Sequence, residues 1–378
     1  MDQSGLKIEK KRTLTEVAPG SFLSIFRGLL QTLILSFFLF ACEKYNAPDI
    51  LSVPIKGKTI LIYAISDNSL KTFSDSVFNM VSDINLSTLH ENLLLYLDDG
   101  KQCNLYVITE NNQLRRIKSY GVRNSVNEDN VRELLQFVRK NYPAKENGLV
   151  LWSHGTGWLP SGKNTRSFGD DKGDVMDIYM LAKCIGNFKY SYIIFDACNM
   201  ACIEVAWEMR EKTKYIVASP TEVPAMGIVD DGSVIQMLLS EGELQGRLDS
   251  ICNAYVDSNK KFLVGKSISV IDTDSLILVA STLKKQGRFS MDIDTNKILC
   301  YDFRGQKIFF DAQDFFDSIG CGALFHKCVT CYNYDKRNSY QWSGLSVFVP
   351  YSGNVPYQDS YSLLSWNVAV GWLDLFGY

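Results

Sequence analysis

The sequence lacks a strong charge imbalance, and it contains no repeat or low-complexity segment. The 378 residues carry a formal net charge of −3, so we expect no broad basic surface and no nucleic-acid partner. Histidine is scarce, since only three are present. With 46% hydrophobic residues, the chain can form one large core with decorations or two domains. This composition excludes the disordered and fibrous classes.

No N-terminal apolar run is long enough for a comfortable membrane span. Residues 29–40 are apolar except for three polar side chains, and basic residues precede them. A membrane span needs about 20 apolar residues. A basic segment followed by a short apolar run is typical of a secretory signal.

The apolar run ends in Leu39-Phe40-Ala41-Cys42, which resembles a bacterial lipobox. The resemblance implies cleavage before Cys42 and lipidation of its thiol. We therefore expect a signal peptide at residues 1–42 and a tether at residues 43–57. The protein is expected to be exported and held by its lipid in the bacterial cell envelope, at the periplasmic or the outer surface. An uncleaved anchor, or a signal cut elsewhere, is the alternative.

Apolar runs alternate with helical periodicity between residues 58 and 218. Continuous runs predict buried strands at residues 58–66, 105–108, 149–152, 192–195 and 215–218. Amphipathic spacing predicts helices at residues 70–97, 128–141, 174–186 and 200–212. This alternation predicts an α/β/α sandwich with a mostly parallel central sheet. We expect a catalytic core at residues 58–220.

The remainder of the chain, residues 221–378, is less regular. It contains predicted strands at residues 267–271 and 345–349 and a final amphipathic helix at residues 360–375. We expect a mixed, largely helical extension that packs on the core, and a monomer overall.

Titratable side chains directly follow two of the predicted strands. His154 follows residues 149–152, and Gly155 lets the backbone turn sharply after it. Cys198 follows residues 192–195. Ligands bind beyond the carboxyl ends of parallel strands, so these side chains are candidates for catalysis. A structural loop histidine and a packed core cysteine are the alternatives.

The pair has a defined chemistry if both side chains share one cleft. A Cys198 thiolate attacks a peptide carbonyl, and His154 activates the thiol or protonates the leaving amine. The N–H groups of Gly155 and Cys198 can hold the oxyanion. We expect a helix to start at Cys198 and to lower its pKa. Asp196 lies two residues before Cys198, so its side chain should point to the same side of the strand. We expect its carboxylate to raise the pKa of the Cys198 thiol. It can bind a substrate Arg or Lys, or alternatively cap the helix.

Two segments carry a family resemblance: LVLWSHGTGW, which contains His154, and YIIFDACNMACIEVAWEM, which contains Cys198. Together they resemble the paired signatures of the clostripain family of cysteine peptidases, within the caspase-like and gingipain-like group. The resemblance implies a caspase-like fold, a His154 and Cys198 dyad, and Asp196 as the acidic determinant for Arg or Lys before the scissile bond. It also implies self-processing after a basic residue between the two segments, at Arg166 or, second, at Lys163.

Cofactor sites are not predicted. The group Cys321, His326, Cys328 and Cys331 holds one Cys-x-x-Cys pair, whereas zinc sites normally have two pairs, so we expect no metal there. Calcium is possible but not assigned, because no EF-hand-like loop exists. Ten cysteines are present, and their irregular spacing predicts that most besides Cys42 and Cys198 are buried thiols.

Three functions remain open. The first is an endopeptidase for Arg or Lys bonds. The second is a catalytically silent surface lipoprotein that binds peptides or host protein. The third is a cysteine hydrolase of a non-peptide amide, which gives Asp196 no task. The complete set of His154, Asp196 and Cys198 favours the first.

Overall fold

The computed structural model describes residues 55–75, 80, 84, 91–109, 111–160, 167–229, 232–257, 266–289, 293–337 and 340–378. All of them belong to one compact unit, Val53–Tyr378. No helix among these residues is both long and apolar enough to cross a membrane.

A nine-stranded sheet forms the centre of this unit, in the order β13-β10-β9-β8-β5-β1-β2-β3-β4. Its strands are β1 (Lys56–Ile65), β2 (Asn92–Asp98), β3 (Cys103–Ile108), β4 (Leu114–Gly121), β5 (Ala144–Trp152), β8 (Tyr190–Asp196), β9 (Thr213–Ala218), β10 (Ser267–Asp272) and β13 (Val329–Tyr334). The five inner strands β9, β8, β5, β1 and β2 run parallel, and only β3 and β10 run opposite to the others. The prediction of a mostly parallel central sheet is therefore confirmed.

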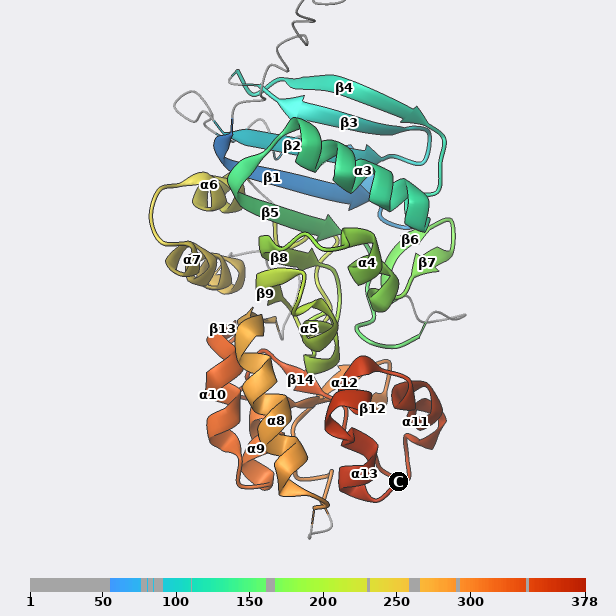
Figure 1. Ribbon diagram of the computed structural model, residues 1–378, viewed down its shortest axis with the longest axis vertical. Helices are drawn as coiled ribbons and strands as arrows, with labels where there is room; N and C mark the ends of the chain where they lie inside the picture. Colours follow the sequence, from blue (N-terminus) through green and yellow to red (C-terminus); the bar gives the residue numbers. More distant parts are fainter. Residues whose placement is uncertain are drawn as a thin grey trace, which may run out of the picture. The chain divides into compact units, whose positions relative to one another are not determined.

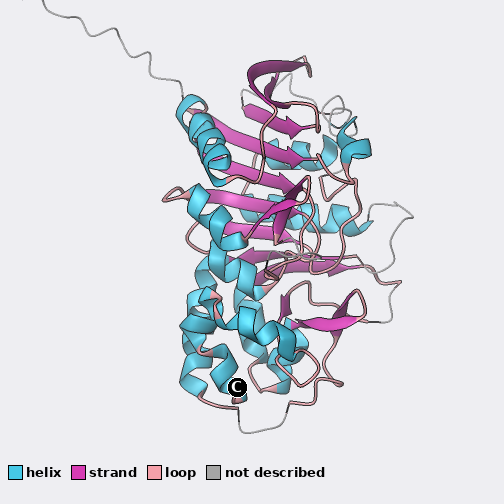
Figure 2. Cartoon of the chain, turned by 90° about the vertical axis from the view of Figure 1, so that its right-hand side faces the viewer, coloured by secondary structure: helices cyan, strands magenta, loops and turns pink. Residues whose placement is uncertain are grey.

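Helices cover both faces of the sheet, as Figure 2 shows with the sheet seen nearly edge-on. Alternate residues of β1 divide between two cores: Leu61, Tyr63 and Ile65 enter one, and Ile60 and Ile62 enter the other. The first core is covered by α3 (Glu128–Asn141), α4 (Ile178–Ile185), α5 (Ile203–Met209) and α8 (Leu276–Gln286), and the second by α6 (Gly232–Leu239) and α7 (Leu244–Asp257). Figure 1 looks onto α3, α4 and α5 in front of the strands. The α/β/α sandwich is confirmed.

Two predicted helices are shorter than expected. Residues 92–97 were expected at the end of a helix but lie in β2, which pairs in parallel with β1. Residues 174–176 form β7 (Asp174–Met176), the partner of β6 (Phe168–Asp171), and α4 begins only at Ile178. A short, continuous apolar run has no periodicity that separates a buried strand from a helix, and pairing with a neighbour decides between them.

The chain beyond residue 220 contributes to the central sheet and also forms a second sheet. β10 pairs with β9, and β13 pairs with β10. The second sheet contains β11 (Cys300–Phe303), β12 (Gln306–Asp311) and β14 (Ser346–Val347). Besides α6, α7 and α8, the α-helices described in this part are α9 (Ala312–Ser318), α10 (Phe325–Cys328), α11 (Val355–Ser362), α12 (Ser365–Val370) and α13 (Trp372–Phe376).

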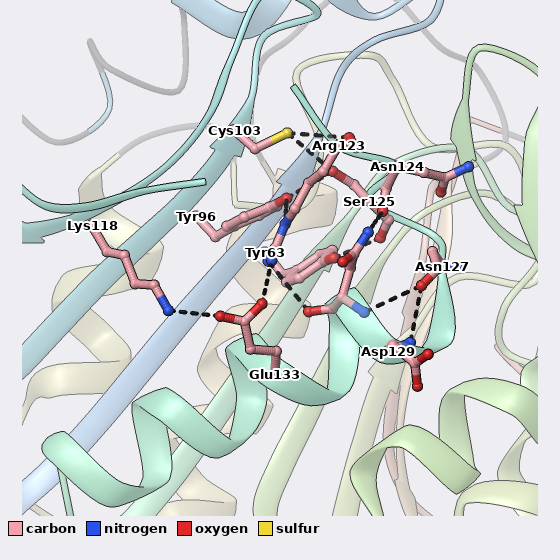
Figure 3. Close-up of polar contacts among 11 residues, drawn as sticks. Tyr63, Tyr96, Cys103, Lys118, Arg123, Asn124, Ser125, Asn127, Asp129 and Glu133 are labelled. Atoms are coloured by element: carbon pink, nitrogen blue, oxygen red, sulfur yellow. Dashed lines mark hydrogen bonds and ion pairs between the residues drawn. The ribbon is translucent and has the colours of Figure 1, made fainter. Parts of the chain in front are cut away.

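A buried polar network ties β1 and β2 to the loop before α3 (Figure 3). The Tyr63 hydroxyl donates to the carbonyl of Ser125 at 2.6 Å, and the Tyr96 hydroxyl hydrogen-bonds to Ser125 Oγ at 2.8 Å. The two tyrosine rings stack with 4.6 Å between their centroids. The Ser125 N–H donates to the Asp171 carboxylate, so the same loop also fixes the β6–β7 hairpin.

Candidate active site

One cleft brings together the side chains that the sequence singled out. It has a volume of about 620 Å³, and its lining includes His154, Asp196 and Cys198. The register of β5 and β8 explains this meeting, because Trp152 at the end of β5 pairs with Asp196 at the end of β8. His154 and Cys198 each follow two residues later on adjacent parallel strands, so both emerge at the same sheet edge.

Hydrogen bonds to β6 hold the loop that carries His154. The N–H of Gly169 donates to the His154 carbonyl at 2.9 Å, and the N–H of Thr156 donates to the Ser167 carbonyl at 3.2 Å. Gly155 lies between these two hydrogen-bonded residues and pairs with Phe168 in an isolated antiparallel bridge, at a position that is not itself hydrogen-bonded. At such a position the N–H points away from the partner strand. Gly155 also lines the cleft.

Ser69 is a site residue that the sequence analysis missed. Its Oγ hydrogen-bonds to Nε2 of His154 at 2.8 Å. Ser69 lies four residues beyond the end of β1, which neighbours β5 in the sheet. The rule that located His154, a polar side chain beyond the carboxyl end of a parallel strand, therefore also applies to Ser69. This hydrogen bond restrains the imidazole ring at the edge of the cleft.

The prediction that a helix starts at Cys198 is wrong. α5 begins at Ile203, with Cys202 as its N-cap residue. The segment between runs alongside neighbouring strands, because Ala201 donates to the Ser219 carbonyl and accepts from the N–H of Ser346. The N-terminus of α5 therefore does not lie at Cys198.

Burial instead raises the pKa of the Cys198 thiol from 9.0 to about 11. The carboxylates of Glu222 and Asp196 raise it further, as expected for Asp196, whereas the Val223 backbone and the Arg304 guanidinium lower it. The Val223 N–H donates to Cys198 Sγ at 3.3 Å. The thiol of the unliganded site is therefore protonated at neutral pH.

Cys202, the other thiol of this segment, is fully buried and cannot reach the cleft. Burial raises its pKa well above the ordinary value. All nine described cysteines are free thiols, and five of them are buried: Cys103, Cys184, Cys202, Cys252 and Cys328. The expectation of mostly buried thiols is confirmed for this part of the chain.

Asp196 is almost completely buried, with 2% of its surface exposed. Its Oδ1 accepts from the N–H of Ile228 at 2.6 Å, and its Oδ2 accepts from the N–H of Val229 at 3.0 Å. It therefore holds the loop after β9 and does not cap α5. Asp196 also lines the cleft.

Gly227 allows that loop to approach the carboxylate. Its φ is +88°, and a Cβ at this position would lie 2.4 Å from Asp196 Oδ2. A side chain here is therefore excluded both by backbone strain and by direct contact. The segment of residues 225–229 also borders a small cavity of about 20 Å³ behind Asp196.

Three further residues of the cleft come from segments that the sequence analysis did not connect with the site. Glu222 belongs to the loop after β9, and Phe303 and Arg304 belong to the β11–β12 hairpin. The hairpin lies about 100 residues beyond Cys198 in the sequence, and nothing local to it indicates its position beside the thiol.

Several sequence predictions fall outside the described residues: the processing residues Lys163 and Arg166 and the lipidation residue Cys42. Around the processing residues, the described residues stop at Pro160 and continue from Ser167.

Among the described residues, no group of three or more His, Cys, Asp or Glu side chains is arranged to hold a metal ion. In the cysteine cluster considered for zinc, the Cys331 thiol interacts with Cys252 of α7, and Cys328 is buried and donates to the Phe325 carbonyl at 3.4 Å.

Known proteins share this sequence pattern and fold. The profile of the Clostripain family matches residues 62–297, which is more than half of the chain and includes His154, Asp196 and Cys198. No curated protein is significantly similar in sequence.

Solved structures of C11 cysteine proteases have a similar fold. One is a secreted protease from Bacteroides thetaiotaomicron in complex with an irreversible peptide inhibitor, with a TM-score of 0.72 and 24% identity over 84% of this chain and 99% of that chain. Another is an inactive zymogen from Parabacteroides distasonis, with a TM-score of 0.69 and 24% identity over the same shares. The family match, the shared fold and the cleft with His154 and Cys198 lead to one conclusion: this chain belongs to the Clostripain family and is a cysteine peptidase.

Proposed function

We propose that the protein is an endopeptidase that cleaves peptide bonds after Arg or Lys. Cys198 is the nucleophile, His154 is the general acid and base, and Asp196 binds the basic side chain. The observation that carries this proposal is the single cleft of about 620 Å³ that all three residues line. Its volume lies in the range of ligand clefts and exceeds the space that one side chain needs.

The chemistry begins with a proton transfer. Because the Cys198 thiol has a pKa of about 11, it must lose its proton to a base when the substrate is bound. His154 is the imidazole of the cleft, and it later returns the proton to the leaving amine. The thiolate attacks the carbonyl carbon, the C–N bond breaks, and water then hydrolyses the acyl-enzyme.

The oxyanion of the tetrahedral intermediate needs hydrogen-bond donors. The N–H of Gly155 points away from β6, and the N–H of Cys198 belongs to the nucleophile itself. Both are rigid backbone groups, so they need no reorganisation during the reaction. Removing one such donor costs about 3 kcal/mol in typical enzymes.

Basic specificity follows from the chemistry of Asp196. A carboxylate can bind a guanidinium through two parallel hydrogen bonds, and Asp196 is a carboxylate of the cleft lining. A substrate Arg or Lys that enters the cleft therefore meets a carboxylate of opposite charge.

Maturation and location belong to the same proposal. Cleavage after Arg166 would cut the chain next to Ser167, which donates through Oγ to the Gly157 carbonyl, and cleavage after Lys163 is the second choice. A similar solved protein is described as an inactive zymogen, which supports a processing step. The lipid on Cys42 would tether the monomeric enzyme to the cell envelope after export. No cofactor is required, and calcium is included in the assay as a variable.

Matched substrates test the assignment of Asp196 without disturbing its backbone partners. Fluorogenic peptides that differ only in Arg or citrulline before the scissile bond are assayed under reducing conditions, with and without calcium. We expect kcat/KM to favour Arg by about 100-fold or more, because citrulline has the shape of Arg but no charge. The Cys198→Ala and His154→Ala forms should be inactive.

Different results refute different parts. No turnover of any basic peptide by the wild-type protein would refute the endopeptidase and favour the silent peptide-binding lipoprotein. Equal turnover of Arg and citrulline peptides would leave the dyad but refute the role of Asp196. N-terminal sequencing of the wild-type and Cys198→Ala proteins reports the processing site, and the same N-terminus in both would exclude self-cleavage.

A further inference from the structure

Arg304 is the one Lys or Arg side chain among the described residues that line the cleft. It occupies the tip of the β11–β12 hairpin, between Phe303 and Gln306. Arg304 and Gly305 both have positive φ, at 53° and 76°, which is the geometry of a two-residue type I′ turn. The first position of such a turn favours Asn, Asp or Gly, so an Arg is conformationally unfavourable here. A strained residue beside an active site points to a function for its side chain.

The hairpin is fixed relative to the nucleophile. Phe303 is 7% exposed and packs edge-on against Phe309, with 5.5 Å between ring centroids. Phe309 lies in β12, which pairs with β14. β14 in turn forms a bridge from Ser346 to Cys202, four residues beyond Cys198. The position of the turn is therefore determined by the sheet that also anchors the nucleophile segment.

The His154 loop contacts the same hairpin. A Cβ at Gly157 would lie 3.1 Å from the ring of Phe309, so the loop after His154 packs closely on β12. The Arg304 guanidinium lies 5.4 Å from the centre of the Phe303 ring, within the range of a cation–π contact that orients it. A rigid turn and an oriented side chain together form a prepared binding group.

We propose that Arg304 is a specificity residue that binds a carboxylate of the peptide substrate close to the scissile bond. The inference rests on the proposed endopeptidase function. Asp196 at the end of β8 takes the basic side chain, and Arg304, from a different element of the same cleft, takes an Asp or Glu side chain within a few residues of it. Because the cleft is larger than one side chain, the residues that flank the basic one also enter it. The preferred substrate segment therefore pairs a basic residue with a nearby acidic one.

Charge supports this division of roles. Glu222 and Asp196 raise the pKa of the Cys198 thiol and Arg304 lowers it, so all three act electrostatically on the space around the sulfur. The effect of Arg304 on the thiol does not outweigh burial. A guanidinium and a carboxylate, by contrast, form a charge-assisted and often bidentate pair.

Paired peptides test the proposal. A series with Arg before the scissile bond carries either Glu or Gln at each of the three positions on either side, and kcat/KM is measured for the wild type, Arg304→Ala and Arg304→Glu. At one or more positions we expect the wild type to favour Glu over Gln by about five- to tenfold, as for a partly exposed charge pair. The ratio should fall to about one in Arg304→Ala and invert in Arg304→Glu.

A general effect on the thiol changes both peptides of a pair equally and cancels in the ratio. Arg116→Ala is the matched control, because it removes an exposed cation from β4, which lies at the edge of the sheet, and leaves the ratio unchanged. An equal Glu to Gln ratio in the wild type and Arg304→Ala, or no preference at any position, would overturn the proposal.

Binding separates this proposal from the proposed function. The same peptide pairs are measured as ligands of Cys198→Ala and of the double variant with Arg304→Ala. If the wild type cleaves nothing but Cys198→Ala binds the Glu peptide more tightly through Arg304, the endopeptidase assignment fails and the carboxylate site stands. If basic peptides are cleaved but neither turnover nor binding depends on Arg304, only the carboxylate site fails.

Discussion

The raised pKa of Cys198 predicts how this thiol reacts in the absence of substrate. Because burial raises it from 9.0 to about 11, the thiolate fraction at pH 8 is about 100-fold smaller than that of an ordinary thiol. A more basic thiolate is intrinsically more nucleophilic, by about six- to tenfold for this difference in pKa. Alkylation of Cys198 at pH 8 should therefore be about tenfold slower than that of an ordinary thiol.

Site-resolved alkylation measures this directly. The protein is treated with iodoacetamide between pH 6 and pH 10, and mass spectrometry follows the peptide that contains Cys198, with the Cys198→Ala protein as the blank. The rate should rise about tenfold per pH unit throughout, because the pKa lies above this range. Glu222→Gln should increase the rate at a given pH, since its carboxylate raises the pKa of the thiol, and Arg304→Ala should decrease it.

A plateau of the rate between pH 6 and pH 8 would refute this reasoning. It would mean that the thiol is already a thiolate in the resting protein, paired with an imidazolium as in many cysteine proteases. The absence of a helix N-terminus at Cys198 and the two neighbouring carboxylates both argue for the continuous rise.

Three further predictions concern buried groups. Burial raises the pKa of Glu204 from 4.5 to about 7, so the free energy of unfolding falls as the pH rises from about 4.5 through 7. In urea unfolding, Glu204→Gln should remove about 3 kcal/mol of this decline. The same pH dependence in the wild type and the variant would contradict the prediction. Burial, with Asp98 nearby, likewise raises the pKa of Asp171 from 3.8 to about 6, so Asp171→Asn should flatten the decline in unfolding free energy between about pH 4 and 6, by less than Glu204→Gln because solvent screens Asp171 more. Gly227→Ala should lower kcat/KM for basic peptides more than tenfold, as a Cβ would press on the carboxylate of Asp196. Gly173→Ala, with φ of +93° and no atom near its Cβ, has the same backbone strain and should retain activity; equal losses in both would attribute the effect to strain alone.

Much of the core of the fold could be predicted from the sequence because it depends on local patterns. The continuous apolar runs of β5 and β8 identify buried parallel strands, and His154 and Cys198 stand two residues beyond their ends. Parallel pairing of these strands is enough to place both residues at one sheet edge.

The secondary-structure prediction failed where the same sequence fits both a helix and a strand or turn. The run in β2 fits a helix as well as a strand, and only its pairing with β1 decides between them. The segment after Cys198 fits a helix start, but hydrogen bonds of Ala201 with Ser219 and Ser346 keep it out of a helix until Ile203. Partners distant in the sequence outweigh local propensity in both cases.

The sequence by itself predicted the α/β/α arrangement and identified His154, Asp196 and Cys198 as candidate site residues, because strand periodicity and short motifs are properties of contiguous residues. Only the tertiary structure decided the environment of the thiol, the backbone partners of Asp196 and the presence of Ser69 and Arg304 in the cleft. Desolvation, charge and hydrogen bonding at the site depend on segments brought together from far apart in the chain, and no local pattern records that proximity.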